Sequence, residues 1–262
     1  MGILMKLKTF LGFMILFAAY HTSELIGNNP IFILCSFLLF FIVAQIVAKL
    51  LGEKGISAFG LQRNKNTSRS LLTGYLLGIL FYGGSFIVSV ISGKIYFDGF
   101  FSIKQIILPL LGIIIITFLS SASEDILTRG YVFKYLPRKL SSATLVGISS
   151  VIYVLNHIWR IDDGSTQWIM LFLMGLTYAI PFAVTGSLWF TIGCHWGWNT
   201  VSLFKSQIGN MSDLKIIDHT TDWTYIITMA IFLIFVSIYS KLVLKPSADR
   251  NVASGLKNGI EL

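Results

Sequence analysis

Long apolar runs alternate with short polar segments along the whole chain. A helix that crosses a membrane needs about 20 mostly apolar residues. Eight runs approach or reach that length, and those that are short or contain polar residues suit helices that line a protein interior. The runs cover residues 7–20, 30–51, 70–92, 103–123, 144–160, 166–183, 187–204 and 223–244. The pattern predicts an all-α fold, a polytopic transmembrane helix bundle with about eight spans.

The composition agrees with this prediction. Of the 262 residues, 55% are hydrophobic and 12% are charged, and the mean hydropathy is +0.76. A soluble domain carries about 25% charged residues. The first run follows Lys6 and Lys8, as in a signal peptide, but no small-residue cleavage motif precedes Asn28, so we interpret it as a retained membrane anchor.

The net charge of +8 has a simple explanation in this setting. Basic residues gather in three segments between or after the apolar runs, at 49–69, 134–139 and 241–257, whereas the other connections contain most of the acidic residues. Basic loops stay cytoplasmic, which predicts a multi-pass protein of a cell membrane with both termini inside. No basic patch with interleaved aromatic residues occurs in the sequence, so we expect no nucleic-acid partner.

The chain divides into four parts on this interpretation. Residues 1–99 form three N-terminal spans with a basic loop, 100–205 form a core, 206–245 contain the final span, and 246–262 form a polar tail predicted to be disordered. Four glycines in the third run are expected to permit close helix packing. They are Gly74, Gly78, Gly83 and Gly84.

Three polar clusters interrupt the apolar pattern of the core. They run from Ser123 to Gly130, from Tyr153 to His157 and from His195 to Asn199. Ionisable groups inside membrane segments are costly and mark candidate functional sites. His21 and His219 show no comparable pattern of partners and are interpreted as loop residues.

Helical spacing gives these clusters a geometry. Asp125 and Arg129 are four residues apart, so they share a helix face and can form an ion pair, which could also be purely structural. Glu124 points about 100° away and stays available. Glu124 and His157 lie roughly equally far, about 23 Å, from a turn near residues 140–142, and His195 lies about 13 Å from the next turn. One shared site opening toward the basic, cytoplasmic side is therefore expected.

Such a set suits amide hydrolysis without a nucleophilic serine or cysteine. A carboxylate and an imidazole can activate a water molecule, and a second imidazole with an amide can stabilise an oxyanion. Glu124, His157 and His195 could alternatively hold a catalytic zinc ion. The sequence lacks the His-Glu-x-x-His motif, so we expect no cofactor, with zinc as the alternative.

The three clusters resemble the motifs of the CAAX protease and bacteriocin-processing family, also called the CPBP or Abi family. Its pattern is Glu-Glu-x-x-x-Arg, then Phe-x-x-x-His, then His-x-x-x-Asn/Asp. Here the motifs are Glu124-Asp125-x-x-x-Arg129, Tyr153-x-x-x-His157 and His195-x-x-x-Asn199. The resemblance covers roughly residues 100–205 and implies a multi-helix intramembrane endopeptidase.

By this resemblance, Glu124 and His157 activate water, His195 and Asn199 are the oxyanion donors, and Asp125 and Arg129 support them. Asp125 replaces the family's second Glu, and Tyr153 replaces its Phe. Neither change removes a presumed catalytic group.

The expected substrate is a membrane-presented peptide or a lipid-modified protein such as a lipoprotein, with membrane lipids as further partners. The composition suggests a bacterial member, whose relatives act in bacteriocin processing and self-immunity. Two other functions stay open: a membrane acyltransferase that uses the same glutamate and histidines, and a non-enzymatic immunity or scaffold protein.

Overall fold

The computed structural model describes residues 2–25, 29–137, 139–205, 209–213 and 223–244. The predicted tail, 246–262, lies outside these residues. The helices are α1 (Ile3–Leu25), α2 (Pro30–Leu50), α3 (Thr67–Ile91), α4 (Ile103–Asp125), α5 (Val132–Tyr135), α6 (Ser142–Leu155), α7 (Ser165–Thr185), α8 (Leu188–Phe204) and α9 (Trp223–Leu242). Short 3-10 helices occupy Ile56–Phe59 and Ile158–Asp163, and a π-helical turn, η2, occupies Ile126–Tyr131.

The structure confirms an all-α bundle of membrane type. Each of the eight predicted apolar runs coincides with a helix, and α4, η2 and α5 form one continuous rod, Ile103–Tyr135. Within the described residues, six helices are long and apolar enough to cross a membrane. The other two, α6 with 14 residues and α8 with 17, are shorter.

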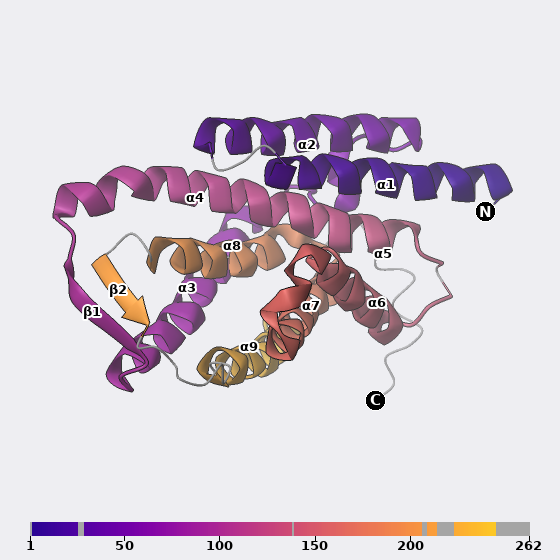
Figure 1. The fold of residues 1–262 in the computed structure, drawn as a ribbon. Helices are drawn as coiled ribbons and strands as arrows, with labels where there is room; N and C mark the ends of the chain where they lie inside the picture. Colours follow the sequence, from indigo (N-terminus) through magenta and orange to yellow (C-terminus); the bar gives the residue numbers. More distant parts are fainter. Residues whose placement is uncertain (1, 26–28, 138, 206–208, 214–222, 245–262) are drawn as a thin grey trace.

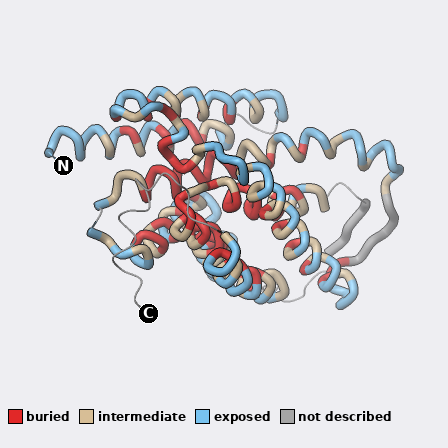
Figure 2. Tube along the Cα trace, turned by 180° about the vertical axis from the view of Figure 1, so that it is seen from behind, coloured by how far each residue is buried: buried red, intermediate tan, exposed pale blue. Residues whose placement is uncertain are grey.

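Helices α7 and α8 make most of the contacts that join the bundle (Figure 1). Helix α8 packs against α3 and α4, and α7 packs between α6 and α9. Helices α1 and α2 lie side by side along α4 and cover one side of the bundle. Burial is concentrated where these helices meet, and their outward faces are exposed (Figure 2). Large apolar side chains such as Ile42, Leu80 and Leu111 lie on those outward faces, as expected for helices in contact with lipid.

Local sequence explains where several helices begin and end. Asn29 caps α2 ahead of Pro30, and Ser102 forms a capping box with Gln105 at the start of α4. Helix α7 ends at Gly186, which takes the left-handed conformation with φ 67°. The chain therefore turns sharply into α8, the helix that carries the third polar cluster.

Small residues bring α3 and α8 into backbone contact. A Cβ atom added to Gly74 or Gly78 would lie 2.3 Å from a carbonyl oxygen of α8, and one added to Gly193 or Gly197 would meet α3 as closely. This matches the packing role predicted for Gly74 and Gly78. The same prediction is wrong for Gly83 and Gly84, which have no atom within 4 Å of an added Cβ.

A small antiparallel sheet was not predicted. Strand β1 (Ile95–Phe100) precedes α4, and β2 (Gly209–Asp213) follows α8. Ile95 pairs with Asp213, more than a hundred residues away in sequence, so no local pattern could have indicated the pairing. The sheet joins the connection between α3 and α4 to the connection after α8, at the C-terminal end of α3. The basic segment 49–69 lies at the other, N-terminal end of α3.

Candidate active site

The first polar cluster lies where α4 changes to the π-helical turn η2. Glu124 and Asp125 are the last two residues of α4, and both are buried. A π-helical turn leaves backbone groups without their usual partners and often marks a functional site. The Ser149 hydroxyl of α6 donates a hydrogen bond to the Thr128 carbonyl at 2.8 Å. This contact attaches α6, which leads into the second cluster, to the turn that follows Glu124.

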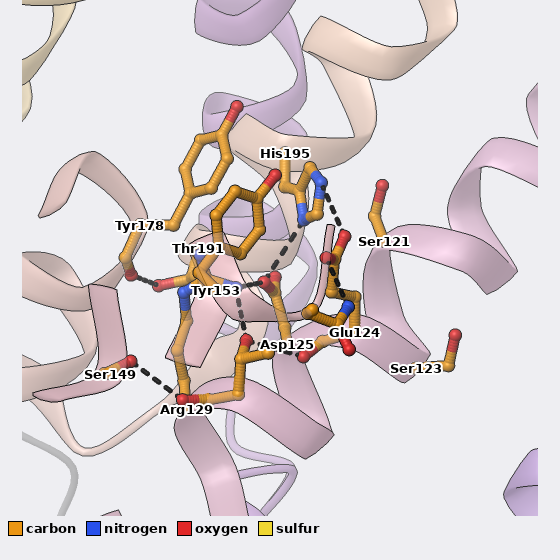
Figure 3. A network of polar contacts seen from close by, with 12 residues as sticks. Ser121, Ser123, Glu124, Asp125, Arg129, Ser149, Tyr153, Tyr178, Thr191 and His195 are labelled. Atoms are coloured by element: carbon orange, nitrogen blue, oxygen red, sulfur yellow. Dashed lines mark hydrogen bonds and ion pairs between the residues drawn. The ribbon is translucent and has the colours of Figure 1, made fainter. Parts of the chain in front are cut away.

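The Glu124 carboxylate is the point at which the clusters meet (Figure 3). The Asn156 side-chain nitrogen donates to Glu124 Oε1 at 2.9 Å. His157 Nε2 lies 3.6 Å from the same oxygen, and His195 Nε2 lies 3.5 Å from Oε2. Glu124 therefore has one direct hydrogen bond and faces one imidazole at each oxygen.

Asp125 points to a different set of partners. It pairs with the Arg129 guanidinium one turn along the chain, and its Oδ1 lies 3.2 Å from His195 Nδ1. All three side chains are almost fully buried. The guanidinium carbon lies 4.7 Å from the ring centre of Tyr153 and 5.2 Å from that of Tyr178. The buried cation is thus held by one carboxylate and two aromatic faces.

The contacts of the two histidines indicate which nitrogen faces the carboxylate. His157 Nδ1 lies 2.9 Å from the Tyr153 carbonyl, and His195 Nδ1 faces Asp125. A carbonyl or carboxylate oxygen accepts, so each Nδ1 donates its proton. Both rings therefore present Nε2 to Glu124. His195 also stacks on Tyr178 at 4.7 Å, which fixes its ring plane.

Asn199 lies one turn beyond His195 on α8 and is less buried. Its side-chain nitrogen donates to the Ser121 hydroxyl at 3.1 Å. An amide carries two N–H donors, so a second one remains for a ligand. The structure thus brings the four predicted residues, Glu124, His157, His195 and Asn199, to the lining of one pocket.

This pocket has a volume of about 470 Å³, which suits a short peptide segment. Its lining extends from Glu124 to Arg160, Gln167, Lys205 and Tyr225. These outer residues belong to the end of α8, the start of α9, the connection from α6 to α7 and the start of α7. That end of the bundle is opposite the basic segments. The expectation of a site that opens toward the basic loops is therefore wrong, because the pocket lining runs from Glu124 to the end of α8 and the start of α9 instead.

The zinc alternative can be tested on the same geometry. Among the described residues, no group of three or more His, Cys, Asp and Glu side chains gathers in a way that could hold a metal ion. A structural or catalytic zinc needs such convergence at about 2 Å from each ligand atom. The mechanism proposed for this site uses water and protein side chains, and dependence on a metal is a matter for chelation experiments.

Sequence reasoning missed three residues at or beside the site. Asn156 donates directly to it, and its position beside His157 was the available signal. Tyr20 lines the same pocket from α1. His21 lies in α1, and the interpretation as a loop residue is wrong: Nε2 contacts the Asn156 carbonyl at 3.1 Å. That partner is 135 residues away, beyond any local pattern.

The comparison with protein families agrees with this geometry. Residues 106–201 match the family described as Rce1-like, type II CAAX prenyl endopeptidase Rce1-like. The matched segment contains all three polar clusters. A search of curated proteins found no match. The resemblance indicated by the three motifs is therefore confirmed: residues 106–201 carry the sequence pattern of the Rce1-like type II CAAX prenyl endopeptidases.

Proposed function

We propose that the protein is an intramembrane endopeptidase that hydrolyses an amide bond of a membrane-presented peptide or lipid-modified protein. One observation carries the proposal: a buried carboxylate, Glu124, faces the Nε2 atoms of His157 and His195 inside a pocket of about 470 Å³. The family match supports a CAAX-type endopeptidase at the level of the family. The residues and the mechanism below belong to the proposal.

The proposed nucleophile is a water molecule bound between Glu124 and His157. Their contact of 3.6 Å is longer than a direct hydrogen bond, and such a gap suits a bridging water. With its Nδ1 proton on the Tyr153 carbonyl, a neutral His157 presents an Nε2 lone pair that orients the water. Glu124 takes the proton as the water oxygen attacks the carbonyl carbon.

The proposed oxyanion donors are His195 and Asn199. Asp125 faces His195 Nδ1, so it stabilises a protonated ring whose Nε2–H can donate to the developing negative charge. The second N–H of the Asn199 amide adds to this. When the tetrahedral intermediate collapses, Glu124 returns its proton to the leaving nitrogen. One water and one amide thus give a carboxylic acid and an amine.

The orientation of the chain is part of the proposal. With the basic segments in the cytoplasm, the pocket mouth near Arg160 and Lys205 faces the opposite side of the membrane. A cysteine placed at Asp162, in a background in which Cys35 and Cys194 are replaced by serine, should react with a membrane-impermeant maleimide added to intact cells. A cysteine placed at Lys54 should react only after the cells are opened.

A comparison of native cells with cells that carry Glu124→Gln tests the activity. Glu53→Gln is the matched control, because Glu53 pairs with Lys134 at 3.0 Å outside the pocket. Protein termini and lipid masses of membrane and secreted proteins are read by mass spectrometry. Termini lost only in Glu124→Gln support the protease, and they name its substrate.

Two other results would contradict the proposal. Changed lipid masses with unchanged termini would mean acyl transfer by the same residues. Unchanged termini and lipids, in cells that keep the phenotype lost on deletion of the protein, would mean that it acts by binding.

A further inference from the structure

Helix α1 precedes the family segment, yet it reaches the active site through two consecutive residues. His21 is buried, and both of its ring nitrogens face backbone carbonyl oxygens. Nδ1 lies 2.9 Å from the Phe17 carbonyl within α1. Nε2 lies 3.1 Å from the Asn156 carbonyl. A ring N–H at Nε2 can donate to the Asn156 carbonyl oxygen.

The Asn156 carbonyl belongs to the peptide bond that joins Asn156 to His157. Both of these residues direct their side chains at Glu124, at 2.9 Å and 3.6 Å. The peptide follows the last residue of α6, where carbonyl groups lack N–H donors from the helix. His21 supplies a donor to the Asn156 carbonyl. It therefore fixes the peptide between Asn156 and His157, the two residues whose side chains face Glu124.

Tyr20 reaches the same pocket from the same helix. It is only 9% exposed and shares the pocket lining with Glu124 and Ser120. A phenol can donate to a carboxylate, so Tyr20 is placed to give Glu124 a donor in addition to Asn156. Two adjacent residues of α1 thus lie at the site, Tyr20 in the pocket lining and His21 on the Asn156–His157 peptide.

We propose that α1 is part of the active site: His21 positions Asn156 and His157, and Tyr20 positions the Glu124 carboxylate. The kinetic consequence rests on the proposed hydrolase function, but the positioning itself does not. The competing explanation is packing alone, because the His21 ring also lies 4.1 Å from that of Phe17. In that case phenylalanine would replace His21 without effect on the site.

Imidazole nitrogen NMR of histidine-labelled protein in detergent tests the positioning directly. The chain has four histidines, so single substitutions assign the spectrum. His21→Phe keeps the ring and removes the donors. Tyr131→Phe is the matched control, because the Tyr131 hydroxyl also ties α1 to the bundle, at the Thr9 carbonyl 2.6 Å away, without touching Asn156.

The proposal expects the His157 ring signals to move in His21→Phe and to stay in place in Tyr131→Phe. His21→Gln, whose amide can donate to the Asn156 carbonyl, should return them toward the wild-type position. Unchanged His157 signals in His21→Phe, or equal changes in both aromatic variants, would overturn it. If His21→Phe does not fold, His21→Leu, which also lacks the ring donors, takes its place: moved His157 signals support the proposal, and wild-type signals refute it.

Kinetics provide the second measurement, on the substrate identified through Glu124→Gln. His21→Phe and Tyr20→Phe should each lower kcat about tenfold with little change in KM, as expected for a lost hydrogen bond near a charged group. Tyr131→Phe should keep the wild-type kcat. If no variant and no wild-type protein cleaves any peptide, the proposed function fails, and the NMR comparison still decides the role of α1.

Discussion

Replacement of Gly74 by alanine tests whether the contact between α3 and α8 holds the site in place. Gly74 lies on α3 and touches no catalytic side chain. An added Cβ would lie 2.3 Å from the Phe190 carbonyl oxygen and 2.9 Å from the Cys194 nitrogen. Ordinary contact begins at 3.4 Å, so the helices must separate by about 1 Å. The atoms in the way are backbone, which cannot rotate aside.

The magnitude follows from that displacement. Overpacking of this kind costs about 1–3 kcal/mol, and at roughly 2–4 °C per kcal/mol for a chain of this size it lowers Tm by roughly 2–12 °C. His195 lies next to Cys194 on α8, so a shift of α8 also moves its ring relative to Glu124. A misplacement of about 1 Å can lower the rate about 100-fold. Stability and activity should therefore fall together.

Gly83→Ala is the control on the same helix, because an added Cβ there meets no atom within 4 Å. Alanine favours the helix over glycine by about 1 kcal/mol, so this variant should be as stable as the wild type or slightly more so. Thermal unfolding in detergent and cleavage of the substrate found through Glu124→Gln are measured on both variants. Equal Tm and activity in Gly74→Ala and Gly83→Ala would refute the reasoning.

Four further outcomes are expected. Asn156→Leu removes the donor to Glu124 and should lower kcat about 10- to 100-fold with KM little changed, as steady-state kinetics would show. Asp125→Asn leaves the buried Arg129 cation without its counter-charge and should cost about 3–5 kcal/mol, seen as a lower Tm. Lys205, held 5.6 Å and 5.3 Å from two aromatic ring centres at the pocket mouth, should favour acidic substrates. Lys205→Gln should therefore raise KM for an acidic peptide but not for its amidated form. Prolonged EDTA treatment should leave cleavage unchanged, and a loss restored by zinc would contradict the metal-free mechanism.

The sequence was sufficient to predict which segments form helices and which of them contain the site. Membrane helices need long apolar runs, so Glu124, His157 and His195 stand out as costly exceptions, and their spacing within each helix is fixed by 3.6 residues per turn. The relation between Asp125 and Arg129 followed from that spacing alone. These features are local, and a local pattern is enough to find them.

Features that depend on where helices end or cross were not predictable in the same way. Counting helical rise from the turn near residues 140–142 assumed straight helices of full length. The π-helical turn after Asp125 and the end of α6 at Leu155 break that assumption. The end at which the pocket opens also depends on how α7, α8 and α9 pack around it, and the helical rise of one hairpin does not specify that packing. The contact between His21 and Asn156 could not be predicted for another reason: it forms only when α1 packs against the end of α6.

The Asp125 replacement can be understood from the charge balance of the buried cluster. A shorter side chain still reaches Arg129, because the two are one turn apart on the same rod. It also reaches His195, because the glycine contacts bring α3 and α8 together and α8 lies against α4. Asp125 and Arg129 then neutralise each other within a network of low dielectric. Glu124 is left facing two imidazoles and the Asn156 amide, so a proton on Glu124 would not leave Arg129 without a counter-charge. The second carboxylate of the motif forms the ion pair with Arg129. That ion pair requires a negative charge at this position, and it does not require the extra methylene of glutamate.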